Sequence, residues 1–367
     1  MRTGELDMRA LARAADRLGE AALDPTQWPD LLEALSRATG SMGAALLQSD
    51  VRTADIPRTR SVDELFADYF AEGWHQHDLR AERGVPLLLR GQSVVTEEDI
   101  VTPDEMRLLP FYRELIARNG CTWFAAVGFW AGQSLWGLSF QRGTREGLLD
   151  RNGKRALARL SQRLTETATL STAVGRIALS SSLNALNAVR CAAIAIDRLG
   201  RVLDCNGAAQ TLFDDELRVH GSQLFVDDKV ADAELEALFA RLRSVGDTDA
   251  VPALPIIVRR RKKPAIIIDL LAVEAAARGP FLGARALLTL KEATPKASPS
   301  IAAMTKLFDL TPAEARLATL LAAGQSVEDI AANLELSRET IRNRLKAVLA
   351  KTGTHRQAEL VALMSRL

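Results

Sequence analysis

The spacing of apolar residues changes twice along the chain, and each change predicts a different kind of structure. In the first ~148 residues, helical spacing alternates with apolar runs of strand length. From about residue 188 to 292, short apolar runs between turns predict strands, whereas residues 301–367 show only helical spacing. We therefore expect a multidomain α+β protein with two α+β domains and an all-α C-terminal domain. The expected N-terminal elements are a helix at 28–38 and strands at 42–47, 123–130 and 134–140.

The central region has the pattern of paired strands. Apolar runs at 192–197 and 201–206 flank a turn, and Asn206 is placed to cap a short helix. Further on, the runs LPIIV and AIIIDLLAV flank the basic sequence RRRKKP, and ARALLTL supplies a final strand. A five-residue basic run is either a nucleic-acid patch or a solvated turn. Its position between two apolar runs favours a solvated hairpin turn.

A long helical segment separates the two α+β regions. Leu157, Leu160 and Leu164 follow helical spacing, but the phase slips before the next apolar set and Gly175 weakens the helix. This pattern favours a linking or dimerising helix over a long coiled coil. The run ATPKASPS cannot sustain a helix, so it marks a linker. The domains we expect are 1–148, the linking helix 149–187, 188–292, the linker 293–300, and 301–367.

Composition and charge narrow the functional classes. The 367 residues are 47% hydrophobic and carry a net charge of +1, so any nucleic-acid contact must come from a local basic cluster. The N-terminus lacks an apolar signal segment, and the longest apolar run, 124–131, is too short to span a bilayer. Three cysteines without metal spacing fit a reducing cytosol, and we expect them to be buried thiols. The expected location is cytoplasmic, with no membrane contact.

The C-terminal region carries a series of helix-capping signals. Thr311-Pro312 followed by Glu314 is a capping box with proline at the first helical position. Gly324 ends that helix, and Ser326 with Asp329 begins the next. A tight turn then leads to Ser337, which caps a third helix.

The third of these helices has a face suited to DNA. Arg342, Asn343 and Lys346 lie together, opposite a buried apolar stripe that includes Ile341 and Val348. Arginine can grip guanine bidentately, asparagine can grip adenine, and lysine can contact a base or a phosphate. Between residues 338 and 356 there are six Lys or Arg and one acidic residue. Basic charge is thus focused on one helix and its exit.

Residues 310–364 resemble the LuxR/FixJ-type (GerE-like) DNA-binding domain nearly from end to end. In chain order the resemblance is carried by LTPAE, Gly324, SVEDIA, LSRETIR, LKAVLAKTG and RQAELV. In that family four helices form a helix-turn-helix domain, the third enters the major groove, and the fourth often pairs in a dimer on DNA. The resemblance implies that Arg342, Asn343 and Lys346 face bases. It assigns phosphate contacts to Arg338, Thr340, Lys351, Thr354 and Arg356, and dimer contacts to Leu360, Val361 and Met364.

The two upstream regions resemble sensor domains by pattern. The strand–turn–strand–helix at 192–213 is similar to a PAS domain, and the N-terminal region is similar to a GAF-type sensor. The N-terminal region also shares one spacing with acyl-homoserine-lactone-binding domains, in which Tyr69 and Asp78 would hold the lactone. It departs from that pattern at Leu65 and Leu79, where the family has Trp and Pro.

The densest group of polar and aromatic residues lies near residue 75. Three interpretations of this group are open: a metal site, a pocket wall for an organic ligand, or a structural aromatic corner. A metal site would need further ligands from elsewhere in the chain. Tryptophans on nearby strands are candidates for the same pocket, although strand aromatics are more often core. The ligand candidates are Tyr69, Trp74, His75, His77, Asp78, Trp123 and Trp136.

These features favour a transcription regulator controlled by a small molecule, acting as a homodimer on double-stranded DNA, with RNA polymerase as a further partner. The alternative is a response regulator controlled by phosphorylation or protein contact, which requires a receiver domain with a parallel α/β order. A third class, an ATPase or enzyme fusion, is disfavoured because 147–155 has neither the glycine spacing nor the Ser/Thr of a phosphate loop. We expect no enzymatic activity, no catalytic residue, no cofactor and no metal.

Overall fold

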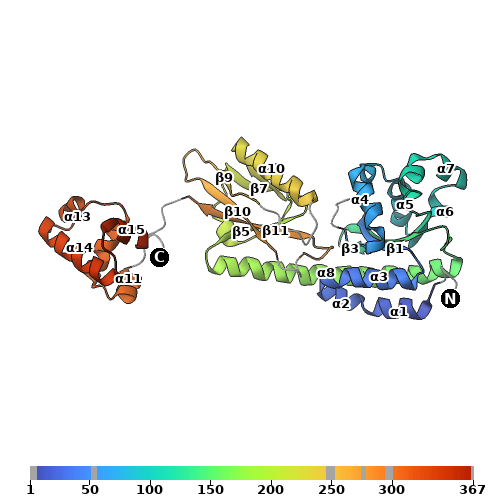
Figure 1. Ribbon diagram of the computed structural model, residues 1–367, viewed down its shortest axis with the longest axis horizontal. Coiled ribbons are helices and arrows are strands. Elements are labelled where there is room, and N and C mark those ends of the chain that lie inside the picture. The colour runs from blue at the N-terminus through green and yellow to red at the C-terminus, as the bar shows by residue number, and fades with distance from the viewer. Residues whose placement is uncertain (1–5, 51–55, 245–252, 274–277, 294–300, 365–367) are drawn as a thin grey trace. The chain divides into compact units, whose positions relative to one another are not determined.

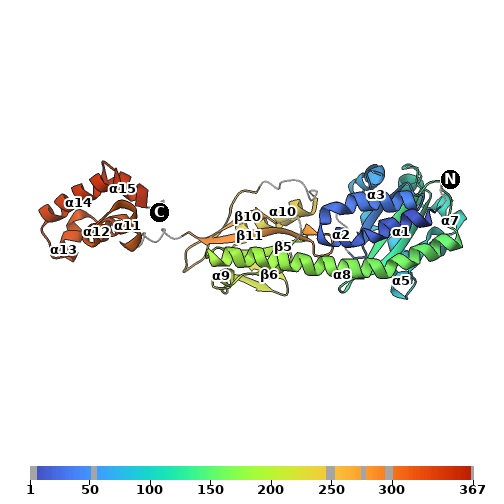
Figure 2. The ribbon, with the colours of Figure 1, turned by 90° about the horizontal axis from the view of Figure 1, so that it is seen from below.

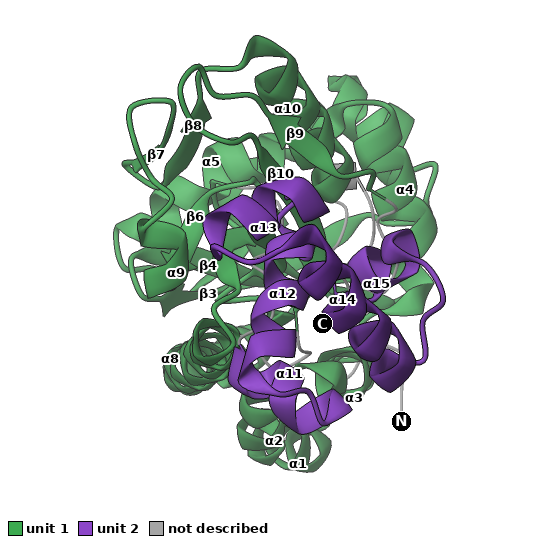
Figure 3. Cartoon of the chain, turned by 90° about the vertical axis from the view of Figure 1, so that its left-hand side faces the viewer, with its two compact units in different colours: residues 1–292 green, residues 293–367 purple. Residues whose placement is uncertain are grey.

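The computed structural model describes residues 6–50, 56–244, 253–273, 278–293 and 301–364. The chain divides into two compact units, Met1–Glu292 and Ala293–Leu367, coloured separately in Figure 3. The linker expected at 293–300 lies, apart from Ala293, outside the described residues.

The N-terminal half of the first unit is a four-stranded antiparallel sheet covered by helices on both faces (Figures 1 and 2). The strand order is β1-β4-β3-β2, with β1 at Gly43–Gln48, β2 at Val94–Thr96, β3 at Trp123–Ala131 and β4 at Ser134–Arg142. Alternate residues of β4 enter two different cores because strand side chains point to opposite faces. Trp136, Leu138 and Phe140 join one core, whereas Gly137 and Ser139 face the other side.

Helices of different lengths cover the two faces of this sheet. The first face packs against α1 (Met8–Asp16), α2 (Leu18–Leu23), α3 (Trp28–Ala38) and the start of α8. The second face packs against α4 (Asp63–Ala71), α5 (Leu79–Leu89), α6 (Glu97–Ile100), α7 (Pro103–Leu108) and the π-helical turn η4 (Phe111–Ile116). Three 3₁₀ turns, η1 (Pro25–Gln27), η2 (Arg60–Val62) and η3 (Trp74–Gln76), connect these helices.

A single helix of 38 residues, α8 (Arg151–Ala188), connects the two halves of the first unit. Its first half packs on β3 and its second half on β5, so one rigid element contacts both sheets. Asp150 caps its N-terminus by accepting a hydrogen bond from Gly153 N. Gly175, which the sequence suggested would weaken the helix, lies buried within it without breaking it.

The central half is a five-stranded antiparallel sheet of order β6-β5-β11-β10-β9. Its strands are β5 (Ala192–Asp197), β6 (Val202–Cys205), β9 (Ile256–Val258), β10 (Ile266–Ala272) and β11 (Ala284–Glu292). The elements α9 (Gly207–Gln210), β7 (Leu217–His220), β8 (Gln223–Val226) and α10 (Lys229–Ser244) complete this half. Asn206 caps α9, as its position in the sequence predicts.

The second unit is helical throughout its described residues. It contains α11 (Ile301–Phe308), α12 (Pro312–Ala322), α13 (Val327–Asn333), α14 (Arg338–Thr352) and α15 (Gln357–Met364). The last four match the helices expected from the sequence. The preceding helix α11 also joins the core, since Met304 is fully buried there.

The expected fold class is confirmed: antiparallel α+β structure is followed by an all-α domain. One detail differs from expectation. Cys121 is buried, but Cys191 and Cys205 are partly exposed because they flank the edge of the central sheet. Among the described residues no helix is both long and apolar enough to cross a membrane.

Candidate ligand cavity and nucleic-acid interface

A cavity of about 90 Å³ lies between the second face of the N-terminal sheet and the helices that cover it. Most of its wall is apolar, from Phe66 and Leu65 on α4, Leu88 on α5 and Phe111 and Leu115 on η4. Polar groups converge at one part of the wall. These are contributed by Ser49, Tyr69, Asp78, Arg80, Ser139 and Gln141. An apolar pocket with a few convergent polar groups is the usual form of a small-molecule site.

Tyr69 and Asp78 are joined within this wall. The Tyr69 hydroxyl donates to Asp78 Oδ2 across 2.8 Å. The other oxygen, Oδ1, accepts from the backbone N–H of Ala81 and so caps α5. Asp78 therefore fixes the start of a helix and also orients an aromatic side chain of the cavity.

A buried ion pair forms a second polar element of the wall. Arg80 Nη2 lies 2.9 Å from Glu97 Oε2, and the Glu97 side chain is fully buried. Arg80 Nη1 donates to Gln141 Oε1, whose amide in turn donates to Ser139 Oγ. The Tyr112 hydroxyl donates to Glu97 Oε1. Every charged member of this group is therefore hydrogen-bonded, as a low-dielectric setting requires.

The electrostatics of the pair keep Arg80 positively charged. Burial opposes the charge, yet the nearby Glu97 carboxylate raises the pKa of Arg80 above its usual value. Burial, followed by the charge of Glu97, raises the pKa of Tyr112, so its phenol stays protonated. The Arg80 guanidinium also lies 4.7 Å from the centre of the Phe124 ring. Because Glu97 compensates Arg80, this wall offers directed hydrogen bonds rather than net positive charge.

The structure separates the seven expected ligand residues into two groups. Tyr69, Asp78 and Trp136 border the cavity, although the Trp136 ring packs on the opposite side of the sheet. The remaining four, Trp74, His75, His77 and Trp123, are not part of the cavity wall.

Local geometry explains why the residues near 75 lie outside the wall. The Trp74 indole donates to Glu72 and its ring packs against Phe111. His75 packs against Phe70, and its buried Nδ1 has no hydrogen-bond partner. His77 is exposed. Among the described residues, no three His, Cys, Asp or Glu side chains gather as metal ligands.

Sequence reasoning did not identify Arg80, Glu97, Ser139 or Gln141. These residues come from α5, α6 and β4, and no spacing in the chain connects them. The one signal available was a charged residue, Glu97, directly after the short strand 94–96. Such a residue commonly caps a helix, so the signal did not distinguish a buried ion pair from a surface cap.

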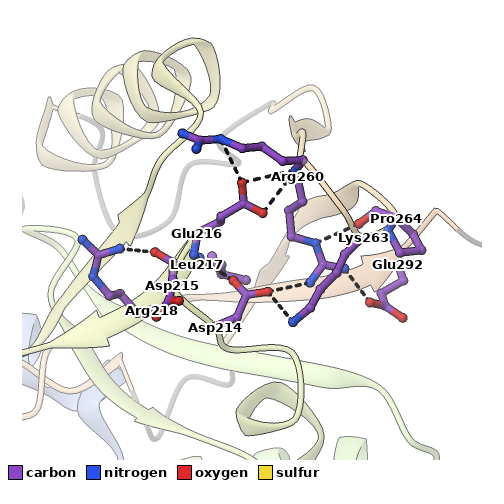
Figure 4. A network of polar contacts seen from close by, with 10 residues as sticks. Asp214, Asp215, Glu216, Leu217, Arg218, Arg260, Lys263, Pro264 and Glu292 are labelled. Atoms are coloured by element: carbon purple, nitrogen blue, oxygen red, sulfur yellow. Dashed lines mark hydrogen bonds and ion pairs between the residues drawn. The ribbon is translucent and has the colours of Figure 1, made fainter.

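The basic run between β9 and β10 is held by acidic side chains (Figure 4). Arg260 is almost completely buried, and it pairs with Asp214 and with Glu292 at the end of β11. Arg261 approaches Glu216 at 3.6 Å, and Lys263 Nζ lies 2.7 Å from Asp214 Oδ2. The expectation of a solvated hairpin turn is therefore corrected for Arg260, because its neighbours supply buried counter-charges.

The second unit builds three capped helices in succession. Thr311 and Glu314 form a capping box on α12, and Ser326 and Asp329 form another on α13. Ser337 caps α14 by accepting from Thr340 N at 3.1 Å. Each of these caps was predicted from the sequence and is confirmed.

The exposed face of α14 has the composition needed to read a major groove. Arg342, Asn343 and Lys346 are all exposed, whereas Ile341 and Val348 are fully buried in the unit's core. Helix α14 is capped at its C-terminus by Gly353, which adopts a left-handed conformation with φ of 67°.

Residues 309–364 match the family model GerE, described as bacterial regulatory proteins of the luxR family. This segment is a LuxR-family DNA-binding domain. The match covers α12 to α15 and begins just after α11. No curated protein matches the chain.

Solved structures with weak similarity to the chain include three proteins. The VqsR LBD domain from Pseudomonas aeruginosa is 17% identical, with 44% of this chain and 95% of that chain covered and a TM-score of 0.34. The phage VqmA–DPO complex is 15% identical, with 50% and 86% covered and a TM-score of 0.18. The E. coli DhaR(N)–DhaL complex is 17% identical, with 78% and 88% covered and a TM-score of 0.24. Scores this low do not establish a shared fold.

The expected phosphate-contacting residues of the LuxR-family domain are in different environments. Arg338, Thr340 and Arg356 are exposed, and Thr354 is partly exposed. Lys351 is exposed, but its Nζ already binds Glu314 Oε2 at 2.8 Å and Asp309 O at 3.1 Å.

The expected dimer contacts on α15 also divide into two kinds. Leu360 and Met364 are 0% and 2% exposed, because they pack into the core of the LuxR-family domain itself. Val361 is partly exposed. The accessible residues of α15 therefore include Val361, Ala358 and Ala362, and not the two core residues.

Proposed function

We propose that the protein is a sequence-specific transcription regulator whose binding to DNA is controlled by a small organic molecule in the N-terminal cavity. The observation that carries the proposal is the joining, in one chain, of a LuxR-family DNA-binding domain to a mainly apolar cavity with convergent polar groups.

The DNA-binding part of the proposal assigns base contacts to Arg342, Asn343 and Lys346. Phosphate contacts are proposed for the exposed or partly exposed polar residues around them, Arg338, Thr340, Lys351, Thr354 and Arg356. Lys351 would share its ammonium group between a phosphate and Glu314.

The cavity wall suggests the chemistry of the ligand. The charges of Arg80 and Glu97 cancel, and Asp78 adds a carboxylate, so the wall disfavours an anion. The apolar majority of the wall favours a mostly apolar, uncharged molecule with a polar end. That end would be hydrogen-bonded near Ser139 and Arg80. A 90 Å³ cavity suits a small molecule, and a larger one would require the surrounding helices to move.

We also propose that the regulator acts as a homodimer. Helix α8 carries a stripe of Leu170, Val174 and Ile177, and the first and last of these are 45% and 68% exposed. Two-fold proteins of this kind read palindromic half-sites. RNA polymerase would be a further partner at the promoter. The protein would bind DNA and RNA polymerase in the cytoplasm.

The response-regulator alternative has weaker support. A receiver domain needs a parallel sheet, whereas every strand pair in the described sheets is antiparallel.

The test begins with full-length protein purified from cells. Small molecules released by denaturation are identified by mass spectrometry. Genomic DNA fragments that bind the protein are then selected, and their affinity for the protein is measured at increasing concentrations of the released compound. We expect one compound in near-stoichiometric amount and an altered affinity for the selected DNA. Ser139→Leu should exclude the compound, whereas Trp74→Ala, outside the wall, should retain it. Retention by Ser139→Leu, or DNA binding indifferent to the compound, would contradict the proposal.

A further inference from the structure

One aromatic side chain of the central half packs against the core of the N-terminal half. Phe281 lies in the loop between β10 and β11, at the tip of a turn that is closed by a 2.8 Å hydrogen bond from Gly283 N to Gly279 O. Gly283 has a φ of 66°, a conformation that favours glycine. Gly283 therefore allows the tight turn that projects Phe281.

The Phe281 ring is held by three aromatic rings of the N-terminal core. Its centre lies 5.1 Å from that of Trp136, 5.5 Å from Trp28 and 5.8 Å from Phe129, and all three contacts are edge-to-face. This arrangement is the favoured geometry for aromatic pairs. The following residue, Leu282, packs instead into the cluster between α8 and the central sheet. Two consecutive residues thus connect two cores.

The contact reaches the cavity through a single residue. Trp136 borders the cavity on β4, where its neighbours Leu135 and Gly137 also line the wall. Its ring, on the other face of the sheet, contacts Phe281. A change in the position of β4 at Gly137 therefore bears directly on Phe281.

The contact continues toward the DNA-binding unit along one strand. Strand β11 begins three residues after Phe281, at Ala284, and ends at Glu292, the last residue of the first unit. Arg260 binds Glu292, so the end of the strand is fixed to the β9–β10 turn (Figure 4). Strand β11 thus connects Phe281 to the point at which the chain enters the second unit.

We propose that Phe281 is the positioning residue through which occupation of the cavity acts on β11. This inference rests on the proposed function, because it assumes that the cavity is filled by a ligand. Filling the cavity moves β4, Trp136 then shifts against Phe281, and residues 278–283 change the position of β11. The ligand can bias these two arrangements only by its difference in affinity for them.

A competing route runs through α8. Thr165 Oγ1 accepts from the backbone N–H of Trp130, and Ser161 donates to Gly128 O, so α8 also follows movements of β3. The experiment must therefore separate Phe281 from the helix.

A substitution can stand in for the unidentified ligand. A Cβ added at Gly137 would meet no atom closer than the Leu47 carbonyl oxygen at 4.0 Å, so Gly137→Val extends into the cavity. Hydrogen exchange of the β11 amides is measured on the full-length protein with and without Gly137→Val, in three backgrounds. These are wild type, Phe281→Ala, and Phe225→Ala, a control that removes an exposed ring of β8 outside the N-terminal core.

We expect Gly137→Val to change β11 exchange by at least about five-fold in the wild-type and Phe225→Ala backgrounds, and by less than about two-fold with Phe281→Ala. Phe281→Leu keeps apolar bulk without the ring edges and should give an intermediate effect, which guards against misfolding of the alanine variant.

A full effect in the Phe281→Ala background would assign the coupling to α8 and overturn the inference. No effect in wild type would also overturn it, even if a natural ligand is recovered from the cavity. Absence of any bound ligand, by contrast, would count against the proposed function and leave the exchange result standing.

Discussion

Lys351 Nζ lies 2.8 Å from Glu314 Oε2, joining the last turn of α14 to the first turn of α12. The same carboxylate accepts from the backbone N–H of Thr311. Its hydrogen bond from Lys351, followed by that from Thr311, lowers the pKa of Glu314. A residue expected to hold DNA thus also fixes the packing of two helices.

Replacing Lys351 should therefore affect stability as well as DNA binding. We expect Lys351→Met to reduce the free energy of unfolding by about 1 kcal/mol, because a partly exposed ion pair and a hydrogen bond are lost. Lys346→Met, on the exposed face of the same helix, should leave stability nearly unchanged. Urea unfolding of the full-length protein measures both. Equal stability of the two variants would show that the Glu314 contact contributes nothing.

Arg342 is predicted to read a base. Loss of one bidentate contact is worth about 1–3 kcal/mol, so Arg342→Ala should weaken operator binding roughly ten- to a hundred-fold. Sequence preference should relax at one position of each half-site. Titrations on operator and scrambled DNA test this prediction. The same loss on both DNAs would mean that Arg342 does not contact bases.

Arg356 is predicted to contact the backbone instead. Such a contact adds affinity without sequence information, so Arg356→Ala should weaken binding to operator DNA and to scrambled DNA by the same factor. The slope of log affinity against log salt should fall by about one unit per subunit. Titrations at several salt concentrations measure the slope. An unchanged slope would show that Arg356 does not contact a phosphate.

Removing Arg80 should be costly because Glu97 has no access to water. Arg80→Met leaves this carboxylate buried beside Tyr112 without its counter-charge, and we expect a loss of roughly 3–5 kcal/mol in the free energy of unfolding. The matched control is Arg83→Met, which breaks a half-exposed pair with Glu105 and should lose less than about 1 kcal/mol. Comparable losses in the two variants would contradict the role of burial.

Asp214 should make the stability of the central half depend on pH. Although burial opposes it, hydrogen bonds led by that from Lys263 lower the pKa of Asp214 from 3.8 to about 2. A lowered pKa stabilises the fold above the unfolded value, and that contribution is lost as pH falls from about 4 to about 2. The difference in unfolding free energy between wild type and Asp214→Asn should shrink over this interval. A difference that stays constant from pH 6 to pH 2 would refute the assignment.

The sequence by itself determined the local features of this protein. Thr311, Ser326 and Ser337 cap helices because the hydroxyl and the amide it accepts from are three residues apart. The exposed row from Arg342 to Lys346 and the strands of both sheets apart from β2 follow equally from periodicity along the chain. Strand β2 is only three residues long and was not among the expected strands. Such interactions are local, so a short stretch of sequence contains all of the information they need.

Only the tertiary structure decided which distant residues meet. Arg80 pairs with Glu97, seventeen positions away on another helix, and binds Gln141 on β4. Phe281 packs against Trp28, Phe129 and Trp136 of the N-terminal core, and no spacing in the sequence predicts that contact. The cavity wall likewise left out Trp74 and His77 and took in residues of β4. These outcomes depend on how sheets and helices pack, because burial and compensation of charge are properties of the assembled core rather than of any one segment.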